Sequence, residues 1–136
     1  MYRIFPSPKH CTFYHNTLSC TSYGAVTTAP EIEESCRAAG FDPSTLLAAV
    51  FPGGFSPEGI TLTAEYVSCA PEGFQLNIAP SGIRISCGDG AGFFYALGVL
   101  VQLAAQADGA LPCAEIADEP ALSVRGIMLD IGRDKI

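Results

Sequence analysis

Two groups of carboxylates lie close enough together in the sequence to suggest acid–base chemistry. Asp118 and Glu119 are adjacent, and Glu31, Glu33 and Glu34 follow a proline. A general acid needs an apolar pocket that raises its pKa, and a carboxylate pair in a turn has none. The three glutamates stand where negative charge stabilises the positive end of a helix. We therefore expect no catalytic residue in either group.

A second cluster has the side chains that metals prefer. It consists of His10, Cys11, His15 and Cys20, and its spacing fits no standard metal site. None of the six cysteines belongs to a C-x-x-C pair, which zinc sites and thioredoxin-like motifs require. We expect no metal and interpret the cysteines as small apolar side chains with free thiols. They are Cys11, Cys20, Cys36, Cys69, Cys87 and Cys113.

A glycine-rich loop, Gly88-Asp89-Gly90-Ala91-Gly92, joins a predicted strand to a predicted helix. Such loops can hold phosphate at a helix N-terminus. Here the spacing is G-x-G-x-G rather than G-x-G-x-x-G, and the preceding strand is expected in a hairpin rather than at the start of a parallel unit. We expect no nucleotide and no other cofactor. The glycines would instead permit a sharp turn and close contact between helix and sheet.

The first part of the chain carries signals for two helices and up to three strands. The stretch through Thr28 predicts one or two short strands. Pro30 and Gly40 mark the beginning and end of a helix over 30–39. Asp42 caps a short apolar helix that ends at 52–54, and 59–66 alternates as a strand does.

The second part predicts a hairpin followed by a long helix. Apolar and polar residues alternate over 74–78 and 83–87, and Ala79-Pro80-Ser81-Gly82 supplies the turn. A helix follows over 91–107, with Asp89 as its cap, and then a strand over 111–116. Asp118-Glu119-Pro120 predicts a turn.

The long helix is apolar all round and carries no charge. Its sheet-facing side is predicted to contain Phe93, Ala96, Leu97, Leu100, Val101 and Ala104. The opposite side contains Phe94, Tyr95, Gly98, Val99 and Gln102. A helix of this kind is normally buried on both sides, so the second side needs another domain or a second subunit.

Composition excludes several classes of protein. Hydrophobic residues make up 49% and charged residues 15%, which excludes disorder. The net charge of −7 and the lack of a Lys/Arg cluster argue against nucleic acid and anionic membranes as partners. No run is long enough to span a membrane and no charged, apolar leader is evident, so we expect a cytoplasmic protein, or a secreted one if a signal peptide was removed.

The final residues have the pattern of a strand buried on both faces. Ile127-Met128-Leu129 is continuously apolar within the stretch 124–133, as in a parallel sheet or barrel. Such a strand needs neighbours on both sides. We therefore expect that the chain is truncated just as a larger domain begins.

These motifs, in this order, resemble the domain that precedes the barrel in glycoside hydrolase family 20 β-N-acetylhexosaminidases. The resemblance rests on the hairpin 73–86, the helix 92–103, Ile116-x-Asp118-x-Pro120 and Arg125-Gly126-Ile127-Met128-Leu129-Asp130-x-x-Arg133. It is good over 59–136, and Ile4-Phe5-Pro6-Ser7-Pro8-Lys9 is similar to the family's amino-terminal opening. The segment between matches in outline.

The resemblance implies an α+β domain with a mixed or mainly antiparallel sheet and helices on one face, packed on a (β/α)8 barrel. Residues 1–120 would be this accessory domain, and 121–136 the first barrel strand. The full-length enzyme would remove terminal N-acetylglucosamine or N-acetylgalactosamine with retention, using the substrate's acetamido oxygen as nucleophile. Its adjacent Asp-Glu pair would lie downstream, so this chain alone would be inactive.

One substrate-binding residue is implied by the resemblance. Arg133 matches the arginine that ends the first barrel strand and hydrogen-bonds sugar hydroxyls, at the strand end where barrel sites form. Arg125 and Asp130 match structural positions. The family's usual Ser-Arg-His is Gly132-Arg133-Asp134 here, which leaves the substrate open.

Two other functions remain open from the sequence. One is the accessory domain of a different glycosidase, such as a family 84 enzyme or an α-glucuronidase. The other is a stand-alone interaction or carbohydrate-binding module, against which the absence of tryptophan and of an aromatic platform argues. Self-association of the chain through its apolar helix is also expected if nothing else covers it.

Overall fold

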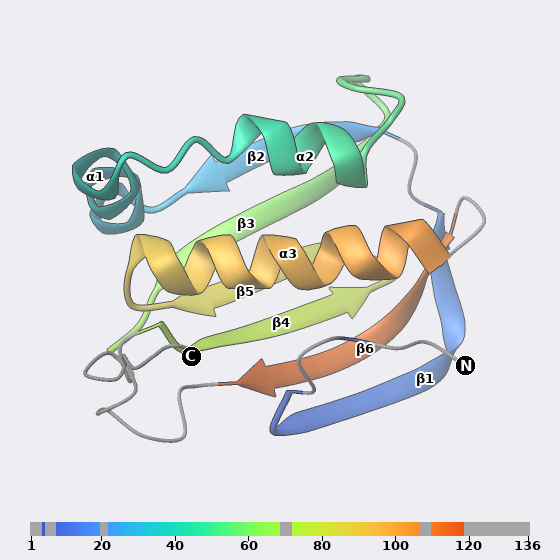
Figure 1. Ribbon diagram of the computed structural model, residues 1–136. Helices are drawn as coiled ribbons and strands as arrows, with labels where there is room; N and C mark the ends of the chain where they lie inside the picture. The colour runs from blue at the N-terminus through green and yellow to red at the C-terminus, as the bar shows by residue number, and fades with distance from the viewer. Residues whose placement is uncertain (1–3, 5–7, 20–21, 69–71, 107–109, 119–136) are drawn as a thin grey trace.

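A computed structural model describes residues 4, 8–19, 22–68, 72–106 and 110–118. In these residues six strands form one sheet in the order β1-β6-β4-β5-β3-β2, and three helices lie on one face of it (Figure 1). The elements are β1 (His10–Ser19), β2 (Tyr23–Thr28), α1 (Pro30–Ala39), α2 (Ser44–Val50), β3 (Ile60–Tyr66), β4 (Phe74–Ala79), β5 (Gly82–Cys87), α3 (Gly90–Gln106) and β6 (Ala110–Asp118).

The sheet is mixed, as the α+β prediction requires. β4 pairs antiparallel with β5 and with β6, and β1 pairs antiparallel with β6. The predicted hairpin is confirmed, with Ala79 opposite Gly82 at its turn. On its other edge β5 runs parallel to β3, and β3 runs parallel to β2. The expected hairpin partner of β5 is thus present, and β5 also has a parallel neighbour that the sequence did not predict, because an interior strand has two edges to pair.

The strand register separates polar and apolar side chains onto the two faces of the sheet. One unbroken row crosses all six strands through Thr27, Thr63, Arg84, Asn77, Glu115 and Thr12. The adjacent row contains Ala64, Ile85, Leu76 and Ile116, which are all buried under the helices. Burying each of these larger apolar side chains contributes about 1.5–3 kcal/mol. Along these two rows the sheet thus has a polar face turned away from the helices, the wet face, and an apolar face buried under them, the dry face.

Local signals place α1 as predicted. It begins at Pro30 and ends at Gly40, whose φ of 78° is the left-handed conformation that favours glycine. Asp42 accepts hydrogen bonds from the backbone N–H and the hydroxyl of Ser44, at 3.1 and 2.8 Å. The carboxylate of Asp42 therefore holds the turn that precedes α2. The predicted capping of α2 by Asp42 is wrong, because α2 begins at Ser44 and Pro43 stands at its N-cap.

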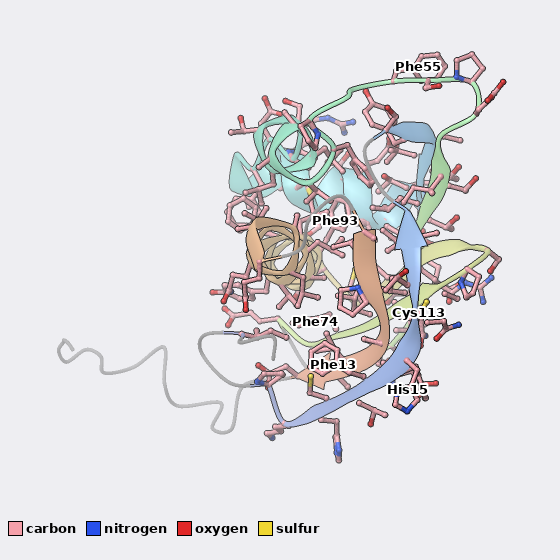
Figure 2. All side chains as sticks on the ribbon, turned by 90° about the vertical axis from the view of Figure 1, so that its right-hand side faces the viewer. Phe13, His15, Phe55, Phe74, Phe93 and Cys113 are labelled. Carbon is pink, nitrogen blue, oxygen red and sulfur yellow. The ribbon has the colours of Figure 1, made fainter. Side chains whose placement is uncertain are left out.

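The long helix α3 is capped by Asp89, as predicted. Oδ1 of Asp89 accepts a hydrogen bond of 2.8 Å from the N–H of Gly92, within the first turn. Figure 2 shows Phe93 and Phe74 between α3 and the sheet. The hydroxyl of Ser35 in α1 accepts a further bond of 2.8 Å from the N–H of Gly90. The start of α3 is thereby tied to α1.

One assignment to the faces of α3 is wrong. Val99 was expected on the outer side but is buried, whereas Val101 and Ala104 are partly buried and pack against the core as predicted. Leu103, which was not assigned, is fully buried. The reason is that α1 and α2 lie beside α3 in the same layer and contact it, so the flanks of α3 are covered as well as its sheet side (Figure 1).

Glycines of the 88–92 loop are required by close approach rather than by their backbone angles. A Cβ on Gly92 would collide with the carbonyl oxygen of Gly73, and one on Gly90 would lie 2.8 Å from the backbone nitrogen of Cys36. Neither glycine has a positive φ. The predicted close contact with the sheet is confirmed, because a Cβ on Gly92 would lie 3.2 Å from Cβ of Cys87 in β5, and α1 and the loop before β4 are further close partners.

Candidate functional site

The suggested metal ligands of β1 lie along an exposed strand. His10 and His15 are exposed, and Cys11 is exposed with a free thiol. Figure 2 shows His15 on the face away from the helices. Within the described residues no group of three or more His, Cys, Asp or Glu side chains is close enough to hold a metal ion. Cys20 lies outside those residues.

Three carboxylates in the described ranges are engaged in hydrogen bonds that join strands or anchor a helix. Oδ2 of Asp89 accepts a bond of 3.0 Å from the N–H of Glu72, in addition to its role as helix cap. Oε1 of Glu65 accepts a bond of 2.9 Å from the hydroxyl of Ser86, and Oε2 of Glu115 accepts one of 2.9 Å from Tyr14. These bonds join neighbouring strands or anchor a helix, which are not the surroundings of a general acid.

The carboxylates weighed for catalysis have similar roles. Glu31 and Glu33 lie in the first turn of α1, as predicted, and Glu34 forms an exposed ion pair with Arg37. Asp118 ends β6 instead of lying in a turn, and its Oδ1 accepts a bond of 3.2 Å from the backbone N–H of Lys9. Asp118 therefore ties the end of β6 to the segment that leads into β1.

Buried thiols in this domain are poorly suited to nucleophilic chemistry. Burial raises the pKa of Cys36, and the charges of Asp89 and Glu33 raise it further. Burial also raises the pKa of Cys113, which Figure 2 shows on the side of the sheet away from the helices. A raised pKa leaves less thiolate at neutral pH, so these cysteines are expected to be unreactive.

The residues carried over from the family motif lie outside the described part of the chain. These are Arg133, Arg125 and Asp130, together with Glu119 of the adjacent pair. The predicted barrel strand 121–136 and the boundary at residue 120 lie there too. The substrate-binding role of Arg133 therefore remains a prediction.

The outer surface of α2 and α3 is the most distinctive surface of the described residues. It is formed by Thr45, Ala48, Ala49, Tyr95, Gly98, Gln102 and Ala105, which are exposed or half-buried. Neither helix contains a charged residue. Tyr95 is 46% exposed. An uncharged helix surface of this kind is typical of a contact between domains.

An aromatic pair that the sequence did not reveal borders this surface. Phe41, in the turn between α1 and α2, stacks on Phe94 of α3 with ring centroids 4.8 Å apart. Phe94 was predicted on the outer side of α3, and this neighbour explains why it is half-buried. The periodicity of α3 placed Phe94, but no local signal connects it with Phe41.

Other exposed aromatic side chains are dispersed over the molecule. Tyr14, Phe55 and Tyr66 belong to β1, to the loop before β3 and to β3. Phe55 meets Tyr23 edge to face, with centroids 6.0 Å apart, and it projects from the body of the domain (Figure 2). Tyr14, Phe55 and Tyr66 thus come from three separate parts of the fold. In the described residues no helix has the length and apolar character needed to cross a membrane.

The fold and this surface define a class of protein: a small one-sided α+β domain with a wet sheet face and an uncharged helix surface. The family model for glycosyl hydrolase family 20, domain 2, matches residues 1–119. The chain belongs to this family. The match includes the amino-terminal half, which the sequence motifs covered only in outline.

Individual relatives agree with this assignment. The chain is 28% identical over 131 residues to a β-hexosaminidase of Vibrio vulnificus. This alignment covers 96% of this chain and 15% of the relative. It resembles the structure of a β-N-acetylhexosaminidase from Bacteroides fragilis with a TM-score of 0.65 and 21% identity, over 88% of this chain and 25% of that one. It also resembles CpGH84D, with a TM-score of 0.68 and 13% identity, over 87% of this chain and 24% of that one. The chain thus spans a quarter or less of these proteins.

Proposed function

We propose that this chain is the non-catalytic accessory domain of a β-N-acetylhexosaminidase that removes terminal N-acetylglucosamine or N-acetylgalactosamine from glycans. The observation that carries the proposal is the match of the family 20 domain 2 model to residues 1–119. The small share of each relative that the chain covers supports a role as one part of a larger enzyme. Asp89, Glu65 and Glu115 support it too, because their hydrogen bonds stabilise a helix and the sheet.

In the proposed enzyme the catalytic groups lie outside residues 1–136. An adjacent Asp-Glu pair would orient the acetamido group and supply the general acid and base, while the acetamido oxygen of the substrate acts as the nucleophile. Within this chain, Arg133 would donate hydrogen bonds to hydroxyls of the bound sugar, because a guanidinium offers several fixed donors.

The accessory domain would act through its contact with the catalytic barrel. Its helix layer has an uncharged outer surface, whereas the opposite sheet face carries the polar row that includes Arg84 and Glu115. Apolar surface gains free energy when it leaves water, and charged side chains lose hydration. We therefore propose that the helix layer, and not the sheet face, contacts the barrel.

The test is an assay with a chromogenic N-acetylglucosaminide. The 136-residue chain is expected to be inactive, and the full-length polypeptide, with a barrel of roughly 250 residues added, is expected to hydrolyse the substrate. Replacing the glutamate of the downstream Asp-Glu pair by glutamine is expected to abolish the activity. Hydrolysis by the short chain would contradict the assignment of catalysis to the missing part.

A second candidate is the accessory domain of a family 84 enzyme, which the likeness to CpGH84D favours. The sequence that follows residue 136 distinguishes the two, because family 84 places two aspartates together where family 20 has Asp-Glu. For the location, we propose the cytoplasm, since Cys11, Cys36 and Cys113 are free thiols. Cell fractionation tests this, and recovery of the protein from the medium would contradict it.

A further inference from the structure

Gly98 lies in the middle of α3, where neither the backbone conformation nor the packing of the described residues requires a glycine. Its backbone is ordinary helix, and positive φ values among the described glycines occur at Gly40, Gly54 and Gly82. Glycine inside a helix is unfavourable compared with alanine because it loses more backbone freedom on folding. A glycine at this position therefore lowers the stability of the helix, and the helix geometry does not require it.

The surroundings of Gly98 contrast with those of the two glycines at the start of the same helix. A Cβ on Gly90 or Gly92 would collide with α1 or with the loop before β4. A Cβ on Gly98 would meet nothing within 4 Å. The described residues thus leave open space above Gly98 and exclude crowding within the domain as the reason for it.

Gly98 is also at the centre of the outer surface of α2 and α3. Tyr95 lies one turn before it and Gln102 one turn after it, so their larger side chains border a shallow position on the helix. Glycine lets another group approach the helix backbone at van der Waals distance, which any side chain would prevent. Because neither helix could pair with a charge, an uncharged group is favoured at this position.

We propose that Gly98 is the point of closest approach between this domain and the catalytic barrel, where an uncharged barrel side chain contacts the backbone of α3 between Tyr95 and Gln102. The proposal rests on the proposed function and adds one position to it. The barrel is the favoured occupant because three quarters or more of each compared relative lies outside the matched region. A second copy of the chain is the alternative occupant.

The test introduces Gly98→Ala and Gly98→Leu into the full-length polypeptide and into the 136-residue chain. The Tm of each variant is measured by thermal unfolding and compared with that of the unmodified protein. In the short chain, Gly98→Ala is expected to raise the Tm by roughly 4 °C, because alanine favours the helix. In the full-length protein the same change is expected to lower the Tm of this domain by about 3 °C, and Gly98→Leu by more, because the added atoms overpack the contact.

A matched control is Ala38→Leu on the exposed side of α1, close to the ion pair of Glu34 and Arg37. Ala38→Leu is expected to change the Tm by the same small amount in the 136-residue chain and in the full-length polypeptide. If the Gly98 variants raise the Tm equally in both, Gly98 faces solvent and the proposal is wrong. If the short chain dimerises and Gly98→Leu abolishes the dimer, a second copy occupies the surface and the barrel does not.

Hydrolysis of the chromogenic N-acetylglucosaminide by the unmodified full-length protein is measured in parallel. Its absence would contradict the proposed function whatever the unfolding data show. Activity combined with equal Tm shifts in both lengths would contradict only the role of Gly98.

Discussion

The hydroxyl of Tyr14 donates a hydrogen bond of 2.9 Å to Oε2 of Glu115, which joins β1 to β6 through their side chains. Tyr14 stands where the register of these strands shifts, between Phe13 and Thr17. The side-chain bond thus holds the edge strand where its regular backbone pairing is interrupted. Glu115 also belongs to the polar row, which places this bond on the wet face of the sheet.

Because of this hydrogen bond, Tyr14 should ionise at a higher pH than a free tyrosine. The hydrogen bond to Glu115, with smaller effects of burial and of the carboxylate charge, raises the pKa of Tyr14 in the folded state. Its stabilising contribution is therefore present below the unfolded pKa of about 10 and is lost as the pH rises through the folded value. In an absorbance titration of tyrosinate, Glu115→Gln should lower the pKa of Tyr14. Glu65→Gln, on the same face, should leave it unchanged.

Removing the cap of α3 should destabilise the domain. Asp89 accepts hydrogen bonds from the N–H groups of both Gly92 and Glu72. Asp89→Ala is expected to lower the free energy of unfolding by about 1–2 kcal/mol, measured by urea denaturation. Asp42→Ala is the control, because its carboxylate makes similar bonds to Ser44 at an exposed site. If Asp42→Ala lowered the free energy of unfolding as much as Asp89→Ala does, the special role of the α3 cap would be contradicted.

Two neighbouring residues of β4 test the separation of the sheet faces. Leu76 is fully buried under the helices, and Gln75 points to the opposite, exposed face. Leu76→Ala should cost about 2–5 kcal/mol of stability because it leaves a cavity. Gln75→Ala should stay within about 0.5 kcal/mol. Denaturant unfolding of both variants, with unchanged m-values, checks this. Similar losses for the two would mean that the open face is also covered.

The thiols should differ in their reaction with an alkylating reagent. Cys11 is exposed, whereas Cys36, Cys87 and Cys113 are buried. Mass spectrometry of protein labelled near pH 8 should find Cys11 modified before Cys36, Cys87 and Cys113. The buried thiols should react roughly 100-fold more slowly, since labelling requires an opening that costs about 3 kcal/mol. In denaturant all four should react at similar rates. Fast labelling of Cys36 in the native protein would contradict its burial beside Gly90.

Local patterns in the sequence determined the elements of this domain. Pro30 and Gly40 delimit α1 because their backbone preferences act on one residue at a time. The hairpin of β4 and β5 follows from alternation and from a turn of a few residues. The cap of α3 by Asp89 was predictable for the same reason, since its carboxylate bonds a residue three positions away.

Only the tertiary structure decided which distant segments meet. The parallel pairing of β5 with β3, the stacking of Phe41 on Phe94 and the burial of Val99 join residues from separate elements. No local propensity specifies such pairings, because they depend on how the whole sheet and helix layer fit together. Gly92 and Gly98 show the same limit: the sequence gives both as glycines of one helix, but the space around each Cβ is defined only in the folded chain.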